Sequence, residues 1–160
     1  MIAAIHGVAY GGGLQIALGA DMRIVTADAR LSVMEIKWGL IPDMSGTQTL
    51  RHLVRDDVAR ELTFTGRIVS GEEARELGLA TQAHEDPRQA AYDIAMEIAS
   101  KSPEGIRAGK ALLNEASLVS LEEGLQLEAS LQKGLIGTSN QVEAVRANLK
   151  KRAPSFSDPE

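Results

Sequence analysis

Three consecutive glycines, Gly11 to Gly13, separate an apolar segment, Met1 to Val8, from a second apolar run, Leu14 to Ala20. The composition of the two runs predicts a strand, a tight loop and a helix in that order. A glycine in front of a helix permits a positive φ, lets another element pack closely or admits a ligand to the main chain. Three in succession favour a ligand, because the free N–H groups of the first helical turn would point into the space that the glycines leave open. We therefore expect an anion or a developing oxyanion at Gly11–Gly13.

The composition argues against several classes of partner and chemistry. The net charge is −5 and the chain has no cysteine, so we expect no nucleic-acid partner, no disulfide and no thiolate nucleophile. No apolar run approaches the roughly 18 residues that a membrane span needs. The glycines match neither GxGxxG nor GxxxxGK[ST], and the histidines (His6, His52 and His84) lack the spacing of metal ligands. The sequence predicts a cytoplasmic protein that binds neither membrane nor metal.

The pattern of predicted elements changes at residue 86. Before it, short strands and helices alternate; after it, only helical patterns follow. In the first part we expect strands at 22–26 and 31–34, helices at 46–53 and 56–63, and a helix capped by Ser70 with Glu73 and ended by Gly78. In the second part, helices are expected from Pro87, Pro103 and Ser120, and a fourth along Val142, Val145 and Leu149. The chain is thus expected to consist of an α/β part, 1–86, and an all-helical part, 87–160.

Three segments carry a family resemblance: "IAAIHGVAYGGGLQIALGADMRIVTADARLSVMEIKWGLIPDMSGTQTL", "TGRIVSGEEARELGLA" and "LKKRAPSF". They resemble the core, the following segment and the C-terminal signature of the enoyl-CoA hydratase/isomerase (crotonase) family. The resemblance implies a partial spiral core of strand–strand–helix turns, followed by helices that form trimers or hexamers. It also implies acyl-CoA thioester substrates, with coenzyme A as part of the substrate and no separate cofactor. The resemblance is to the family's C-terminal two thirds, and the N-terminal part, which usually supplies one oxyanion-hole donor, is missing from this sequence.

The resemblance assigns roles around the glycines. The N–H of Gly12 would be an oxyanion-hole donor that stabilises the enolate formed when a proton leaves the carbon next to the thioester. A side chain on Gly12 would block the approach, and Gly11 is expected to bind substrate beside it. The family's hydratases use two glutamates, but this sequence has Gln15 at the first position and Glu35 at the second. An amide cannot take or give a proton near neutral pH, so Gln15 would orient a water or a substrate oxygen, and Glu35 would be the acid and base.

Three further residues are candidates for the site. Asp43 matches the second catalytic acid of dienoyl-CoA isomerases in the family, but an aspartate after Pro42 is equally suited to a turn or a helix cap. Trp38 is expected to pack near the acyl pocket. Lys151 resembles a C-terminal lysine that reaches the CoA phosphates of a neighbouring subunit, although a KKR sequence is usually a solvated surface.

The single retained glutamate favours double-bond isomerisation of an acyl-CoA. Two alternatives remain open: an enoyl-CoA hydratase, which is a lyase, and a non-catalytic acyl-CoA-binding or assembly module. The length of the acyl chain and the position of its double bond depend partly on residues outside this sequence.

Overall fold

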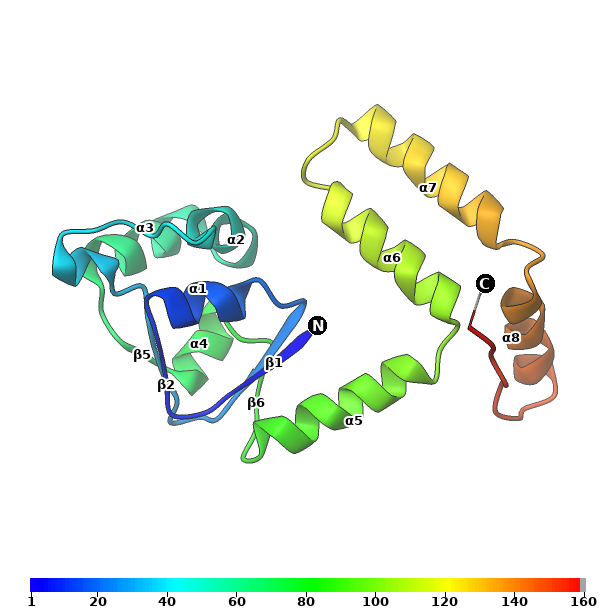
Figure 1. Ribbon diagram of the computed structural model, residues 1–160, viewed down its shortest axis with the longest axis horizontal. Helices are drawn as coiled ribbons and strands as arrows, with labels where there is room; N and C mark the ends of the chain where they lie inside the picture. Colours follow the sequence, from blue (N-terminus) through cyan, green and yellow to red (C-terminus); the bar gives the residue numbers. More distant parts are fainter. Residues whose placement is uncertain (159–160) are drawn as a thin grey trace. The chain divides into compact units, whose positions relative to one another are not determined.

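The computed structural model describes residues 1–158, and its first part contains two small sheets (Figure 1). One sheet is parallel, in the order β1–β3–β6. The other has the order β2–β4–β5, with β5 antiparallel to β4. The strands are β1 (Ile2–Ile5), β2 (Val8–Tyr10), β3 (Met22–Val25), β4 (Arg30–Ser32), β5 (Val69–Ser70) and β6 (Gln82–Ala83).

Successive strands alternate between the two sheets. β1 passes into β2 at Gly7, whose φ of 69° lies in the left-handed region that glycine adopts without steric cost. The strand expected over residues 1–8 is therefore two strands, broken at this glycine. In the next turn of the chain β3 pairs with β1 and β4 pairs with β2, so one strand–strand–helix turn stacks on the previous one. This arrangement fits the partial spiral core that the family resemblance implies.

The helices of the first part bury their apolar faces in one core. They are α1 (Gly12–Leu18), the 3-10 helix η1 (Glu35–Trp38), α2 (Gly46–Leu53), α3 (Asp56–Thr65) and α4 (Gly71–Leu77). The core side chains come from these helices and from both sheets, and include Leu14, Leu18, Val25, Leu31, Leu50, Leu62, Val69, Ala74 and Leu79. Burial of this apolar surface fixes α1 and the end of β4, the two elements that carry the candidate site.

A buried cation, Arg23, links the end of α1 to the segment after α4. Its side chain is only 4% exposed. Its Nε donates to the carbonyl of Leu79 at 2.7 Å, and its Nη1 donates to the carbonyl of Ala20 at 2.7 Å. Burial lowers the pKa of Arg23, and the nearby Asp21 partly offsets that effect. The guanidinium thus satisfies carbonyls that would otherwise be buried without a donor.

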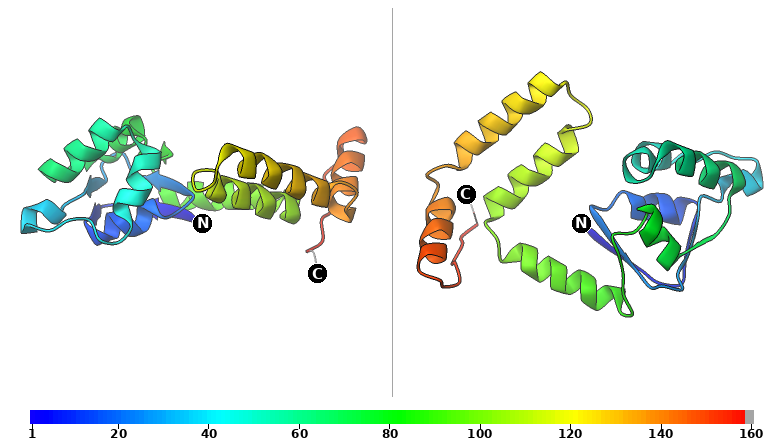
Figure 2. Two further views of the ribbon diagram at one scale, coloured as in Figure 1. Left: turned by 90° about the horizontal axis from the view of Figure 1, so that it is seen from above. Right: turned by 180° about the vertical axis from the view of Figure 1, so that it is seen from behind.

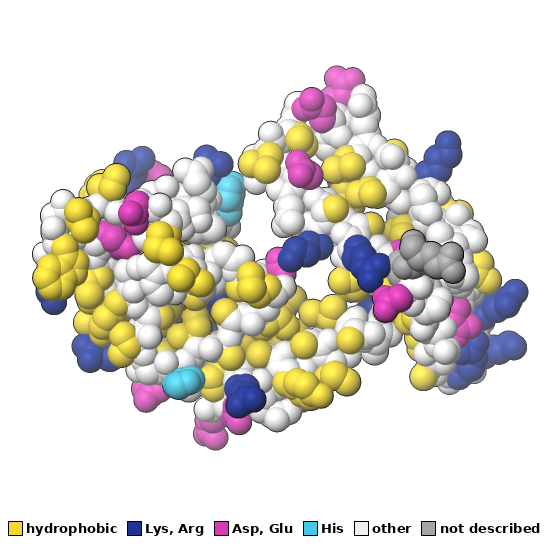
Figure 3. All heavy atoms as spheres, viewed as in Figure 1, with side chains coloured by type: hydrophobic (Ala, Val, Ile, Leu, Met, Phe, Trp, Pro, Cys, Tyr) yellow, Lys and Arg dark blue, Asp and Glu magenta, His cyan; other side chains and the backbone are white. Residues whose placement is uncertain are grey.

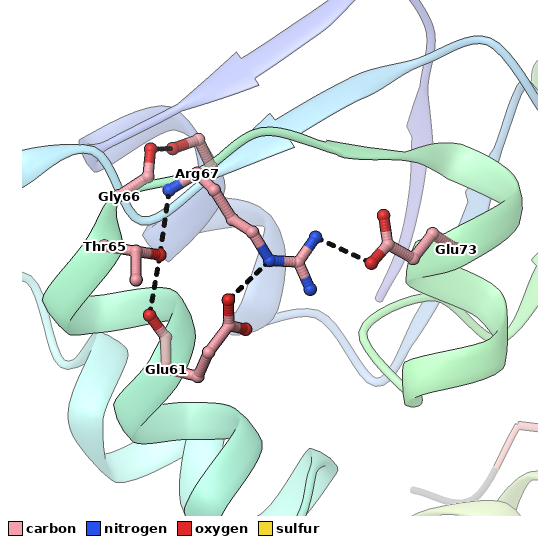
Figure 4. Close-up of polar contacts among 6 residues, drawn as sticks. Glu61, Thr65, Gly66, Arg67 and Glu73 are labelled. Carbon is pink, nitrogen blue, oxygen red and sulfur yellow. Dashed lines mark hydrogen bonds and ion pairs between the residues drawn. The ribbon is translucent and has the colours of Figure 1, made fainter.

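Arg67 connects α3 to α4 (Figure 4). Its Nε donates to Glu61 and its Nη1 to Glu73, each at 2.6 Å. The hydroxyl of Ser70 accepts the backbone N–H of Glu73 at 3.1 Å, as the capping-box prediction requires. The Glu73 carboxylate, however, binds Arg67, so only half of the predicted box forms here.

The chain divides into two compact units, 1–94 and 95–160. The boundary lies inside α5 (Pro87–Ala99), whereas the change of sequence pattern lies at residue 86. Pro87 and Ala90, in the first turn of α5, are buried, so the start of this helix belongs to the first unit. The second unit is all-helical, as expected, with α6 (Pro103–Glu115), α7 (Leu121–Leu135) and α8 (Ser139–Leu149).

Within the second unit α6 and α7 lie side by side (Figures 1 and 2). The capping box that opens α7 is complete, because Ser120 and Glu123 satisfy each other's backbone N–H groups. Apolar side chains remain exposed on these helices and the turn between them, among them Leu113, Leu118, Leu121 and Leu125 (Figure 3). In the part of the chain that the structure describes, no helix is both long and apolar enough to cross a membrane.

Candidate active site

A cavity of about 330 Å³ opens where the start of α1 meets η1 and the loop before α2. Five of the candidate site residues line it, and a sixth, Gln15, contacts Glu35 in its wall. The cavity is lined by Tyr10, Gly11, Gly12, Met34, Glu35, Trp38, Leu40, Asp43 and Met44. The structure therefore brings together segments that lie more than 20 residues apart in the sequence.

Gly11 and Gly12 form the floor of the cavity beside α1. Gly11 has φ 53° and ψ −125°, a conformation that side chains rarely adopt, and its N–H donates to the carbonyl of Ser32 at 3.0 Å. A Cβ on Gly11 would lie 3.4 Å from Oε1 of Glu35, and one on Gly12 would lie 2.9 Å from Sδ of Met44. The first helical bond of α1 runs from Gln15 N–H to the Gly11 carbonyl. The N–H groups of Gly12 and Gly13 come before this bond, so neither donates to a carbonyl within the helix.

Glu35 is the buried acid of the cavity. It is the first residue of η1, three residues beyond the end of β4, and is 9% exposed. Oε1 accepts a hydrogen bond from Nε2 of Gln15 at 2.5 Å. Oε2 is also buried and has no hydrogen-bond partner among the described residues. A buried carboxylate oxygen without a donor is unfavourable, and such groups occur frequently at functional sites.

Gln15 lies against Glu35 and does not line the cavity. It is 3% exposed and projects from α1. Its Oε1 accepts the backbone N–H of Met44 at 2.8 Å and that of Gly46 at 3.0 Å. Both ends of the amide are thus bound to protein. The structure gives Gln15 contacts with Glu35 and with the loop before α2, and its expected substrate-binding role stays a prediction.

Asp43 and Trp38 lie at the open side of the cavity. Asp43 is exposed and lines the cavity. It does not cap α2, because the N-cap position is occupied by Ser45. Trp38 is 70% exposed, with Nζ of Lys37 5.6 Å from the centre of its ring. The position of Asp43 in the cavity fits an acid, the start of α2 gives the cap to Ser45, and the acid and turn roles both stay predictions.

Lys151 lies in the second unit, directly after α8, with φ 51°. It lines a separate cavity of about 680 Å³, to which Lys101 and Arg152 also contribute. Arg152 is bound to the carboxylate of Glu143, which together with the N–H of Ser155 lowers the pKa of Glu143 to about 2. The described residues contain no cluster of three or more histidine, aspartate or glutamate side chains that could hold a metal ion.

Two residues of the site, Met44 and Gly46, were not expected from the sequence. Their backbone N–H groups hold Gln15, and a Cβ on Gly46 would lie 2.7 Å from Oε1 of Gln15. The only sequence signal for this contact is the glycine itself, which follows "PDMS" at the start of a helix.

A family model described as enoyl-CoA hydratase/isomerase matches residues 1–159. The chain belongs to the enoyl-CoA hydratase/isomerase family. Enoyl-CoA hydratase domain-containing protein 2 of mouse (Mus musculus), a mitochondrial protein, is 37% identical over 97% of this chain and 54% of its own length. The probable enoyl-CoA hydratase of Bacillus subtilis (strain 168) is 37% identical over 98% of this chain and 62% of its own length. Mouse mitochondrial methylglutaconyl-CoA hydratase is 35% identical over 97% and 51%.

Solved structures of family members have the same fold. An enoyl-CoA hydratase from Bacillus anthracis superposes with a TM-score of 0.93 at 37% identity, over 97% of this chain and 61% of that chain. One from Polaromonas sp. JS666 superposes with a TM-score of 0.92 at 29% identity, over 98% and 62%. The chain spans about half the length of the curated relatives it matches. These relatives include mitochondrial and bacterial proteins, so the cytoplasmic location stays a prediction.

Proposed function

We propose that this family member moves a carbon–carbon double bond along an acyl-CoA thioester, with Glu35 as both base and acid. The observation that carries the proposal is the contact between Glu35 and Gln15 at 2.5 Å, which places an amide directly beside the single buried carboxyl of the cavity. An amide donates a hydrogen bond but does not exchange a proton near neutral pH. The cavity therefore has one buried acid–base group, as a proton shuttle between two carbons requires.

The proposed reaction needs only proton transfers. The Glu35 carboxylate removes a proton from the carbon next to the thioester carbonyl, and the electron pair of that C–H bond moves toward the thioester oxygen. The N–H of Gly12 stabilises the resulting enolate oxygen, and one such donor contributes about 3–4 kcal/mol in a dry site. The carboxyl group then returns the proton to a carbon two positions along the chain, which leaves the double bond shifted by one position. Gly11 keeps the approach to the donor clear.

Hydration is the second candidate, because the relatives are named as hydratases. Addition of water across a double bond requires removal of a proton from water and delivery of another to carbon. Two acid–base groups commonly divide these tasks, and Gln15 cannot serve as one of them. Asp43, which lines the same cavity, is the group that would have to supply the second function. The same residue is the proposed second acid if the substrate is a dienoyl thioester.

Substrate tests separate these reactions. Full-length protein should be assayed with 3-enoyl, 2-enoyl and dienoyl-CoA, with products identified by mass and by absorbance. We expect shifted double bonds and no gain of 18 mass units. Appreciable conversion of 2-enoyl-CoA to a hydroxyacyl-CoA would contradict isomerisation and support hydration.

Glu35→Gln tests the role of the acid. We expect the rate constant of turnover to fall by about 10²–10⁴-fold while acyl-CoA binding persists, since loss of a general acid–base group has that effect. Glu61→Gln, on the exterior of α3, is the matched control and should keep full activity. If the wild type binds acyl-CoA but turns over none of the substrates, the protein is a binding module and Glu35→Gln changes no activity.

The proposal includes contacts beyond the cavity. Lys151 is assigned to the phosphates of coenzyme A, and the exposed leucines of α6 and α7 are assigned to a trimer or hexamer interface. Sedimentation of the full-length protein tests the second point: Leu113→Glu should yield monomers if this face assembles, because it places a charge on a side chain that is 80% exposed in the single chain. An unchanged sedimentation coefficient would place the interface elsewhere.

A further inference from the structure

The orientation of the Gln15 amide is fixed by its surroundings. The hydrogen-bond partners of the amide determine which end carries the oxygen and which the NH₂. One end faces the backbone N–H groups of Met44 and Gly46, at 2.8 and 3.0 Å. Because these groups can only donate, the atom that they face must be the amide oxygen. The NH₂ end must then face Glu35.

This orientation makes the two oxygens of Glu35 unequal. Oε1 accepts the N–H of Gln15 at 2.5 Å and lies against Gly11, where an added Cβ would be 3.4 Å away. Oε2 has no partner among the described residues. In a protonated carboxyl group the carbonyl oxygen is the better acceptor, so the oxygen that receives the N–H keeps its lone pairs and the other carries the hydrogen.

We infer that Gln15 is a positioning residue that holds Glu35 in one orientation and confines its transferable proton to Oε2. The inference rests on the proposed isomerase function and adds to it a role for the amide that replaces an acid. Gln15 itself exchanges no proton. It donates to Oε1, and the loop amides prevent it from turning over.

The test variant is Gln15→Glu, which has the same shape and keeps both acceptor contacts to Met44 and Gly46. It removes the N–H donor and places a second carboxyl beside Oε1 of Glu35, whereas the contacts that anchor the loop remain. We expect kcat to fall at least about tenfold with KM nearly unchanged, because Oε1 loses its donor. We also expect two titration steps in the pH dependence of kcat where the wild type has one, since two adjacent carboxyls release their protons in turn. An unchanged kcat with a single step would overturn the inference.

A second variant covers the case in which two adjacent carboxyls destabilise the fold. The double substitution Gln15→Glu with Glu35→Gln keeps one carboxyl, one amide and the same composition, so a donor and an acceptor still meet between α1 and η1. We expect it to melt near the wild-type temperature and to have at least about 100-fold lower kcat, because its carboxyl is no longer on η1. Activity within about threefold of the wild type would overturn the inference.

A measurement without turnover separates this inference from the proposed function. Carbon-13 NMR of labelled glutamate side chains should show Glu35 titrating alone in the wild type and as part of a two-step pair in Gln15→Glu. If the wild type isomerises no acyl-CoA but the carboxyl titrations differ in this way, the proposed function fails and the positioning of Glu35 stands. If the wild type isomerises and the titrations are identical, the inference fails alone.

Discussion

Gly46→Ala is the substitution that most directly tests how the site is held together. The added methyl group would lie 2.7 Å from Oε1 of Gln15 and 2.9 Å from both its Cδ and Cγ. Real Cβ contacts essentially never come this close, so either Gln15 or the start of α2 must move. Gln15 is 3% exposed and has little space to turn into. Gly46 does not have a positive φ, so the effect comes from this overlap and not from backbone strain.

The expected cost follows from the contacts that would be lost. Displacement of Gln15 removes the acceptor of two backbone N–H groups, one of them buried, and its contact with Glu35. Each buried donor left without an acceptor costs about 1–3 kcal/mol, and partial access of water to Met44 reduces the second cost. We expect the free energy of unfolding to fall by about 2–4 kcal/mol. In a protein of this size each kcal/mol lowers the melting temperature by about 2–4 °C, which gives a decrease of about 4–16 °C.

Thermal and urea unfolding, followed by circular dichroism, measure this change. Gly13→Ala is the matched control, because a Cβ at that position meets no atom within 4 Å and lies in a helix, where alanine is favoured by about 0.5–1 kcal/mol. Gly13→Ala should therefore melt at or above the wild-type temperature. If Gly46→Ala and Gly13→Ala were equally stable, Gln15 would be free to leave its position, and the argument that it holds Glu35 would be refuted.

Three other substitutions test separate parts of the fold. Arg23→Met should lower the free energy of unfolding by about 3–5 kcal/mol in urea titrations, because two charged hydrogen bonds to buried carbonyls are lost; a change under about 1 kcal/mol would contradict this. Gly71→Ala should cost about 3 kcal/mol or more, since its Cβ would lie 1.9 Å from the carbonyl oxygen of Thr26, and an unchanged melting temperature would show that α4 moves freely. The pKa of Glu143 is lowered to about 2 by Arg152, so its stabilisation is present above the unfolded value near 4.5 and is lost as the pH falls toward 2. Glu143→Gln should therefore flatten the pH dependence of unfolding between pH 4.5 and 2, and an equally steep dependence would argue against that ion pair.

The fold follows from the sequence where local signals are strong. The helix predicted at 46–53 is α2 with the same bounds, and α6 and α7 start at Pro103 and after Ser120, as expected. The start of α1 was placed two residues late, at Leu14, because glycine has a low helix propensity and yet Gly12 and Gly13 are helical here. Tertiary packing of Leu14 and Leu18 in the core outweighs that propensity.

The site could be predicted only in part, since several of its contacts use the backbone. Glu35 and Gly12 were identified by resemblance, and the structure places both at one cavity. The anchoring of Gln15 uses the backbone N–H groups of Met44 and Gly46, so its only sequence signal is the glycine at position 46. The N-cap of α2 is Ser45 at φ 63°, a conformation that propensity does not favour for serine, and Asp43 is thereby free to face the cavity.

An amide beside the buried acid also has an electrostatic consequence for the proposed reaction. When Glu35 takes a proton, its negative charge passes to the enolate oxygen, and when the proton returns the charge comes back. An ionised glutamate in place of Gln15 would add a second negative charge close to Oε1, and two such charges 4 Å apart repel by about 4 kcal/mol at an effective dielectric constant of 20. Gln15 supplies shape and a hydrogen-bond donor without that charge. Glu35 and the enolate oxygen then share one negative charge at each stage, so the amide favours proton transfer between carbons over chemistry in which positions 15 and 35 are both acids.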